Sequence, residues 1–305
     1  MKLKNFAPFT WGVLTWTLIV ILWGAYVRAT GSGAGCGQHW PLCDGQVLPQ
    51  APDVEMRIEF THRMLSGGAI LLIAAMVFWG FRVAQKEHPV RIGLVASGIL
   101  IIVEALLGAG LVLFELVAEN SSAARAFAVA LHLANTLLLV GSLALTAYWA
   151  SGGKPVQIKG QGAKAWLLGA GLLGMLLIGM SGAVTALGDT LFPASSLAEG
   201  LAADKDPNAH FLIRLRVYHP VIAVMVAGYS LYLVRMLFSQ NQGLARKLLV
   251  ALVVIGIIQL SAGLVNLILL APIYMQVIHL LTADLVWITY VLATAAILAK
   301  PQPVS

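Results

Sequence analysis

The stretch EFTHRMLSGGAILLIAAMVFWGF, residues 59–81, places charged and titratable side chains at the start of a long apolar run. A histidine that enters lipid costs free energy unless it has a partner, so an intramembrane histidine indicates a functional site. His62 has a counterpart, because His219 stands 157 positions later at the start of another apolar run, and the same offset relates Gly31 to Gly188. Duplication of one segment is the simplest explanation.

Composition identifies a membrane protein. The chain has 305 residues, of which 59% are hydrophobic and 10% charged, against roughly 25% charged in soluble domains. We expect the first apolar run to be retained, because it is long enough to span the bilayer and no signal-peptide cleavage site follows it. An all-α fold with eight membrane spans is predicted, because runs that can cross ~30 Å of hydrocarbon fall at residues 9–29, 58–83, 90–117, 124–149, 165–187, 211–238, 244–270 and 273–298.

The net charge of +6 marks a side of the membrane and does not indicate a nucleic-acid partner. Both termini and the loops after the second, fourth and sixth runs have only one acid, Glu87, beside their basic residues. These basic residues are Lys2, Lys4, Arg82, Lys86, Arg91, Lys154, Lys159, Lys164, Arg235, Arg246, Lys247 and Lys300. We therefore expect a multi-pass protein of the cell inner membrane with both termini in the cytoplasm and the longer loops, 31–57 and 188–210, outside.

The boundary between the two copies is a polar, glycine-rich linker at residues 151–163. It separates an N-terminal four-helix bundle, residues 1–150, from a C-terminal one, residues 164–305. An even number of helices per copy keeps both copies in the same orientation, so we predict a parallel repeat about an axis along the membrane normal.

Each half contributes one histidine near the start of its second helix and one near the start of its fourth. A lone histidine in an apolar helix usually bonds a carbonyl or packs against a neighbour, but four at matched positions favour a ligand role. Two imidazoles on neighbouring helices can ligate a heme iron from opposite sides. Zinc is disfavoured, because no thiolate or third imidazole accompanies either pair. The sequence therefore predicts one heme per half, on the pairs His62 with His132 and His219 with His279.

Both cysteines of the chain, Cys36 and Cys43, lie in the first outer loop. In an oxidising compartment they can reach disulfide distance across a turn that contains glycine and proline. Two interpretations remain open. One is a purely structural bridge, and the other is a dithiol that exchanges electrons or is handled by a maturation partner.

The cysteine loop and the histidine motif together resemble heme A synthases. The resemblance rests on Gly31-Ser-Gly-Ala-Gly-Cys36, Trp40-Pro41-Leu42-Cys43 and Glu59-Phe-Thr-His62-Arg63 in a duplicated eight-helix frame. Members of that family oxidise the C8 methyl of heme O to a formyl group, giving heme A for terminal oxidases.

The resemblance also implies a role for each candidate residue. It implies heme O as substrate on His62 and His132, a permanent heme b on His219 and His279, Glu59 in the active site, and Cys36 with Cys43 as the outer-loop pair. It further suggests a heme O synthase as a partner and an external electron acceptor whose identity the sequence does not encode. Membrane lipid surrounds the chain, and its oligomeric state, including a homo-oligomer, is left open.

Three departures from the family pattern stand out. Loop 188–210 lacks the second cysteine pair that members often have, and His219 is followed by Pro220 where arginine is common. Arg216, one helical turn before His219, can compensate by pairing with a heme propionate. Glu104 occupies a position where glutamine is expected. It is either a proton-handling group or a neutral hydrogen-bonding one, and we favour the second.

The expected reaction breaks C–H bonds of an unactivated methyl group, which side chains cannot do without a redox cofactor. Two histidines on the substrate iron leave no site for O₂. The hypothesis is therefore electron withdrawal, attack by water, a second such round to a gem-diol, and dehydration to the aldehyde. Glu59, three residues before His62, would stabilise the cation or accept a proton. The alternative for Glu59 is a solvated acid paired with Arg63.

Two other functions use the same residues. One is a diheme b-type membrane carrier that exchanges electrons with quinone. The other is a transporter built from parallel repeats, with the histidines and Glu104 as proton relays. The cysteine loop favours the synthase, because neither alternative predicts that run of residues.

Overall fold

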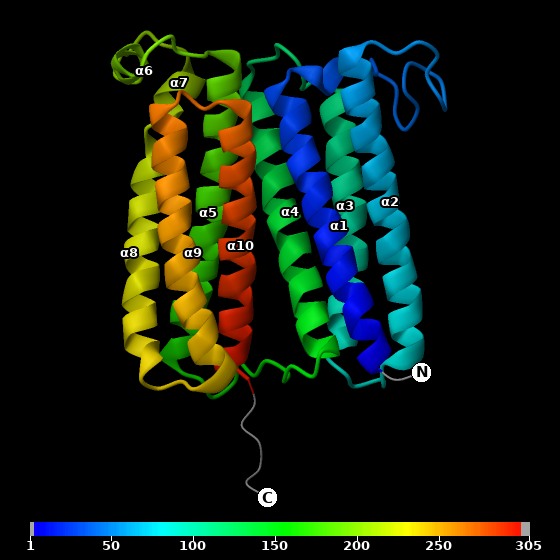
Figure 1. Ribbon diagram of the computed structural model, residues 1–305, viewed down its shortest axis with the longest axis vertical. Coiled ribbons are helices and arrows are strands. Elements are labelled where there is room, and N and C mark those ends of the chain that lie inside the picture. The colour runs from blue at the N-terminus through cyan, green and yellow to red at the C-terminus, as the bar shows by residue number, and fades with distance from the viewer. Residues whose placement is uncertain (1–2, 300–305) are drawn as a thin grey trace, which may run out of the picture.

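The computed structural model describes residues 3–299, and its regular structure is helical throughout (Figure 1). Among the described residues, eight segments are long and apolar enough to cross a membrane, which confirms the predicted all-α, multi-pass fold. Lys2 and Lys300, assigned to the cytoplasmic side, lie outside the described residues. The long helices are α1 (Leu3–Ala29), α2 (Val54–Val83), α3 (Val90–Leu113), α4 (Ala123–Ala150), α5 (Ala163–Leu191), α8 (Tyr218–Phe238), α9 (Gly243–Ile268) and α10 (Ile273–Ile297), and the short ones are η1 (Ser32–Ala34), α6 (Leu197–Ala203) and α7 (Phe211–Leu215).

Most helix bounds lie within a few residues of the prediction, but the sixth predicted span is interrupted. Residues 211–238 form two helices, because α7 ends at Leu215 and α8 begins at Tyr218. Pro220 explains the interruption. A proline is tolerated in the first turn of a helix, but its ring clashes with the carbonyl four residues earlier. That carbonyl belongs to Arg216, where the break falls.

The long helices form two groups. Figure 1 shows α1–α4 on one side and α5, α8, α9 and α10 on the other. The Cys36–Cys43 loop, α6 and α7 lie at one end, here called the loop end, and residues 151–162 lie at the other, the linker end. An antiparallel bridge between Val156 and Ala299 ties the linker to the end of α10. This arrangement is consistent with two four-helix bundles, and the boundaries 1–150, 151–163 and 164–305 stay a prediction.

The two halves meet where α4 packs against α5 and α10 and where α1 packs against α10. Within this interface α4 and α10 are most buried toward the linker end. From Asp284 onward, nearly every described residue of α10 is buried, and the same is true of α4 beyond Asn135. Trp287 on α10 links the two helices by donating Nε1–H to the carbonyl oxygen of Leu137 on α4 at 2.6 Å. At the loop end both helices are partly exposed, and His132 and His279 lie in these looser segments.

A partly buried arginine joins the halves at the loop end. Arg28, in the last turn of α1, donates to the carbonyl oxygen of Ala186 at 2.7 Å and to Thr190 Oγ1 at 2.6 Å, both on α5. It also donates to Gln276 Oε1 on α10 at 2.7 Å. The polar bridge fixes α1 of one half against two helices of the other.

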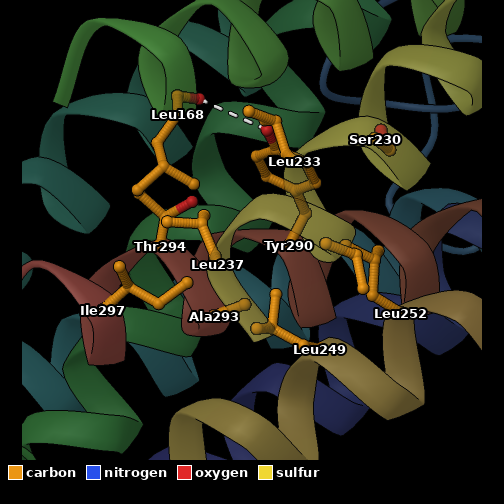
Figure 2. A pocket seen from close by; sticks show the side chains of 11 residues that line it. Leu168, Ser230, Leu233, Leu237, Leu249, Leu252, Tyr290, Ala293, Thr294 and Ile297 are labelled. Carbon is orange, nitrogen blue, oxygen red and sulfur yellow. Dashed lines mark hydrogen bonds between the residues drawn. The ribbon is translucent and has the colours of Figure 1, made fainter. Parts of the chain in front are cut away.

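Figure 2 shows the apolar core of the second half, where side chains from α8, α9 and α10 surround Tyr290. The Tyr290 hydroxyl points at the carbonyl oxygen of Leu168 on α5, 3.5 Å away. A glycine makes room for it, since a Cβ at Gly171 would lie 1.7 Å from that hydroxyl oxygen. The glycine therefore lets α5 and α10 approach closely.

This contact predicts that Gly171→Ala will destabilise the second half. Tyr290 is 2% exposed and cannot swing away, so overpacking should lower the free energy of unfolding by roughly 1–3 kcal/mol. Gly169→Ala on the same helix is the matched control, because a Cβ there meets nothing within 4 Å and alanine favours a helix by about 1 kcal/mol. Unfolding of the purified variants in denaturing detergent measures both effects. Equal stability of the two variants would contradict the packing argument.

Candidate functional site

The four predicted histidines all lie on long helices toward the loop end. His62 is on α2, His132 on α4, His219 on α8 and His279 on α10. Side-chain caps fix where two of these helices begin: Asp53 accepts from the amide of Met56 at the start of α2, and Ser122 accepts from the amide of Arg125 at the start of α4. Such caps satisfy amides that a helix start leaves free, and they set the depth of the histidines that follow.

Each imidazole ring rests on a glycine of a neighbouring helix. A Cβ added at three of these glycines would lie 2.9 Å from Cε1 of the ring, and at the fourth it would lie 3.8 Å away. A larger side chain would thus push at least three of the rings out of place. The pairs are Gly24 with His62, Gly182 with His219, Gly263 with His279 and, at the longer distance, Gly108 with His132. These contacts were not predicted, although glycines at matched positions of both halves gave a signal for them.

The second pair has the spacing of two ligands on one metal. The ring centroids of His219 and His279 are 6.4 Å apart, and the ring planes are nearly perpendicular at 89°. An imidazole nitrogen lies ~2 Å from a metal it binds. With the ring centre ~1 Å behind that nitrogen, two rings on opposite sides of one ion stand ~6 Å apart. The geometry therefore fits the predicted heme iron.

The first pair is His62 on α2 and His132 on α4. Nδ1 of each ring is buried and has no hydrogen-bond partner among residues 3–299. A ring so placed inside a membrane is costly unless it serves a ligand. The glycine contacts fit a heme in this half too, and the assignment of ligands stays a prediction.

Glu104 connects α3 to α4 beside His132. Its Oε2 accepts from Asn135 Nδ2 at 2.6 Å, and its Oε1 contacts the Thr136 hydroxyl. Oε1 also lies 3.6 Å from His132 Nδ1. The second half repeats the arrangement with an amide, since Gln259 Nε2 lies 3.4 Å from His279 Nε2. Glu104 thus takes part in a hydrogen-bonded network, and the neutral role favoured from the sequence stays a prediction.

The cysteine loop is fastened to the start of α2. Cys36 and Cys43 form a disulfide, and the amide of Cys36 donates to Glu59 Oε2 at 2.7 Å. Arg63 donates to Glu59 Oε1 and to the backbone carbonyl oxygens of His39 and Leu42. Glu59 is therefore paired with Arg63 as one interpretation expected, but it is 3% exposed and not solvated.

Arg216 faces the outer loop of the second half. Its Nη1 lies 3.0 Å from Asp189 Oδ1 and its Nη2 lies 2.9 Å from Asp204 Oδ1. These pairs join the end of α5 to the residue after α6, in the loop that lacks a second cysteine pair. Two carboxylates already engage the guanidinium, so its predicted contact with a heme propionate finds no support in these contacts and stays a prediction.

Comparison with known proteins places these features in a family. The family described as COX15-CtaA, cytochrome oxidase assembly protein, matches residues 7–291. The chain is 52% identical over 298 residues to a protein of Thermus thermophilus named protoheme IX farnesyltransferase, covering 96% of this chain and 49% of that protein. It is 28% identical over 261 residues to heme A synthase of an Exiguobacterium species, covering 85% and 82%. The chain thus spans about half the length of its Thermus relative.

The glycine contacts predict that Gly263→Ala will lower heme content. The added Cβ, 2.9 Å from Cε1 of His279, would displace the ring from its position opposite His219. Gly256→Ala is the control on the same helix, because a Cβ there meets nothing within 4 Å. Absorbance of the purified proteins, per mole of chain, measures the bound heme. Full heme content in Gly263→Ala would show that the glycine does not position the ring.

Proposed function

The chain belongs to the COX15-CtaA family of cytochrome oxidase assembly proteins, and on that premise we propose that it is a heme A synthase. It oxidises the C8 methyl of heme O to a formyl group and so provides heme A for terminal oxidases. The observation that carries the proposal is the facing pair of imidazoles, His219 and His279, at 6.4 Å in one half of a duplicated frame. Similarity to the heme A synthase of Exiguobacterium supports it.

The two halves take different hemes in this proposal. His62 and His132 hold heme O as substrate, and His219 and His279 hold a resident heme b. When bound, heme b supplies a one-electron redox centre, which no side chain can offer. Conversion of a methyl group and one water to a formyl group releases four electrons and four protons, and an external acceptor takes the electrons.

The side chains of the first half position the substrate and handle protons. With His62 and His132 both on the substrate iron, O₂ has no open site there, so water is the proposed source of the formyl oxygen. Glu59 lies on the same face of α2 as His62, three residues earlier. Arg63 and the amide of Cys36 hold the carboxylate in place, where it accepts a proton or stabilises developing positive charge.

Location and partners follow from the same proposal. The protein lies in the cell inner membrane with both termini in the cytoplasm, which directs the loop end and both heme sites outward. A heme O synthase is the proposed partner, because a relative named protoheme IX farnesyltransferase contains a region similar to this chain within about half its length. Assembly as a homo-oligomer remains an expectation from the sequence.

The site favours redox chemistry over farnesyl transfer. Paired imidazoles suit iron, whereas a diphosphate substrate is commonly bound through magnesium ions that carboxylates hold. The electron carrier and the transporter remain the rival functions, because a diheme carrier would use the same four histidines.

Pigment analysis tests the proposal directly. The chain is expressed in cells that make heme O, and the extracted hemes are separated and identified by mass spectrometry. Heme A is expected with the native chain and not with His62→Ala. Heme b and heme O without heme A would favour the electron carrier, and a colourless protein in heme-replete cells would favour the transporter.

Isotope labelling tests the route. In water enriched in ¹⁸O, the formyl group should carry the label after exchange of the aldehyde oxygen has been corrected with a heme A standard. Under ¹⁸O₂ in ordinary water it should remain unlabelled. A formyl oxygen drawn from O₂ would rule out attack by water.

Replacement of Glu59 tests its proposed role. Glu59→Gln keeps the size of the side chain but removes the proton acceptor, so turnover should fall by ~100-fold while heme content stays unchanged. Glu55→Gln, an exposed acid one turn earlier on α2, is the control and should keep full activity. Unchanged turnover in Glu59→Gln would remove this residue from the catalytic set.

A further inference from the structure

Among residues 3–299, His219 is the one of the four histidines whose Nδ1 has a hydrogen-bond partner. Ser181, on α5, lies with its Oγ 3.1 Å from Nδ1 of His219. The same hydroxyl donates to the carbonyl oxygen of Ile178 at 2.9 Å, one turn back on its own helix. A serine hydroxyl has one hydrogen. With that hydrogen on Ile178, Oγ accepts from the imidazole.

We assign the hydroxyl hydrogen to Ile178, and this assignment sets the tautomer of His219. The proton then stands on Nδ1, and Nε2 keeps the lone pair that a metal needs. A hydrogen-bond acceptor at the nitrogen that does not bind the metal also sets the orientation of the imidazole ring and raises its basicity as a ligand. Together with Gly182 beneath the ring, Ser181 holds His219 ready for an iron.

The other three rings lack this support. Nδ1 is buried without a hydrogen-bond partner in His62, His132 and His279, counting all residues between 3 and 299. His279 therefore depends on its opposite ring and on Gln259 for its orientation. Within the second half, the orientation of His219 is therefore better defined by Ser181 than the orientation of His279 is by Gln259.

No hydroxyl stands at the corresponding place in the first half. By the 157-residue offset that relates His62 to His219, the counterpart of Ser181 is Gly24, which lies against His62 as Gly182 lies against His219. The residue before Gly24 is Trp23, as Ser181 is the residue before Gly182. The indole Nε1–H of Trp23 donates to the carbonyl oxygen of Ile58 at 3.0 Å. Its only donor is thus used, and an indole has no acceptor to offer an imidazole.

We propose that Ser181 is a positioning residue that locks His219 in its iron-binding tautomer and so makes the second half the site that retains its heme. The first half has no equivalent bond, because Nδ1 of His62 and of His132 has no hydrogen-bond partner among residues 3–299 and the nearest group to His132 Nδ1, Glu104 Oε1, lies 3.6 Å away. This inference rests on the proposed function and deepens it. A synthase needs one heme that stays and one that leaves as product, and the duplicated frame provides the difference through one hydroxyl.

The test measures how fast the second-half heme leaves. Variants are made in the full-length chain carrying His62→Ala, so that one heme remains, and repeated in the chain with both hemes, where two release phases are resolved. Apomyoglobin in excess captures heme released from the purified protein, and absorbance gives the rate. The low-spin EPR signal of the oxidised heme reports the relative orientation of the two rings.

Ser181→Ala should release heme about 10–100-fold faster and should alter the EPR signal. That factor is the usual loss when a group that hydrogen-bonds a metal-binding side chain is removed. Ser181→Thr keeps the hydroxyl and should restore both. Ser230→Ala is the matched control, because Ser230 on α8 makes the same kind of bond to a carbonyl of its own helix, Val226 at 2.8 Å, and lies in the core shown in Figure 2.

Wild-type release and an unchanged EPR signal in Ser181→Ala would overturn the positioning role and leave the proposed function intact. Equal acceleration in Ser230→Ala would overturn it as well, because general loosening of the half would then explain the effect. Failure of the proposed function looks different. In that case the native chain would yield no heme A on pigment extraction, whatever the rate of heme release from Ser181→Ala.

Discussion

The structure depends on one constraint, which is that an imidazole placed in a membrane must find a partner to offset its lost hydration. Four such rings occur here at matched depths, and the surrounding sequence serves to hold them. Glycines on neighbouring helices receive the rings, and side-chain caps set where α2 and α4 begin. Tight packing toward the linker end leaves the loop end open around them. The 6.4 Å spacing of His219 and His279 is the clearest product of this arrangement.

The two halves share an arrangement of four long helices but differ in the contacts around their histidines. In the first half, the disulfide loop is fastened to α2 through Glu59 and Arg63, which places a buried carboxylate one turn from His62. In the second half, Arg216 ties its outer loop with ion pairs, and Ser181 supports His219. Arg28 on α1 of the first half donates hydrogen bonds to α5 and α10 of the second half.

The sequence predicted the spans and the histidine positions well, because hydrocarbon thickness imposes long apolar runs and because polar residues within them stand out. It was less informative where contacts depend on helix rotation and on loop folding. The apolar run at 211–238 predicted one helix, and the break at Arg216 that Pro220 causes was not predicted. Spacing alone suggested a heme propionate as the partner of Arg216 and did not indicate its ion pairs with Asp189 and Asp204. Ser181 gave no signal, since a serine in a membrane helix usually bonds its own backbone.

The central claim is that each half binds one heme through its own pair of imidazoles. Separate alanine substitutions of His132 and His279, followed by extraction and identification of the hemes that remain, test it most directly. The account predicts that His132→Ala loses heme O and heme A but keeps heme b, whereas His279→Ala loses heme b. Loss of the same pigment from both variants, or full retention by both, would contradict the assignment of one heme to each half.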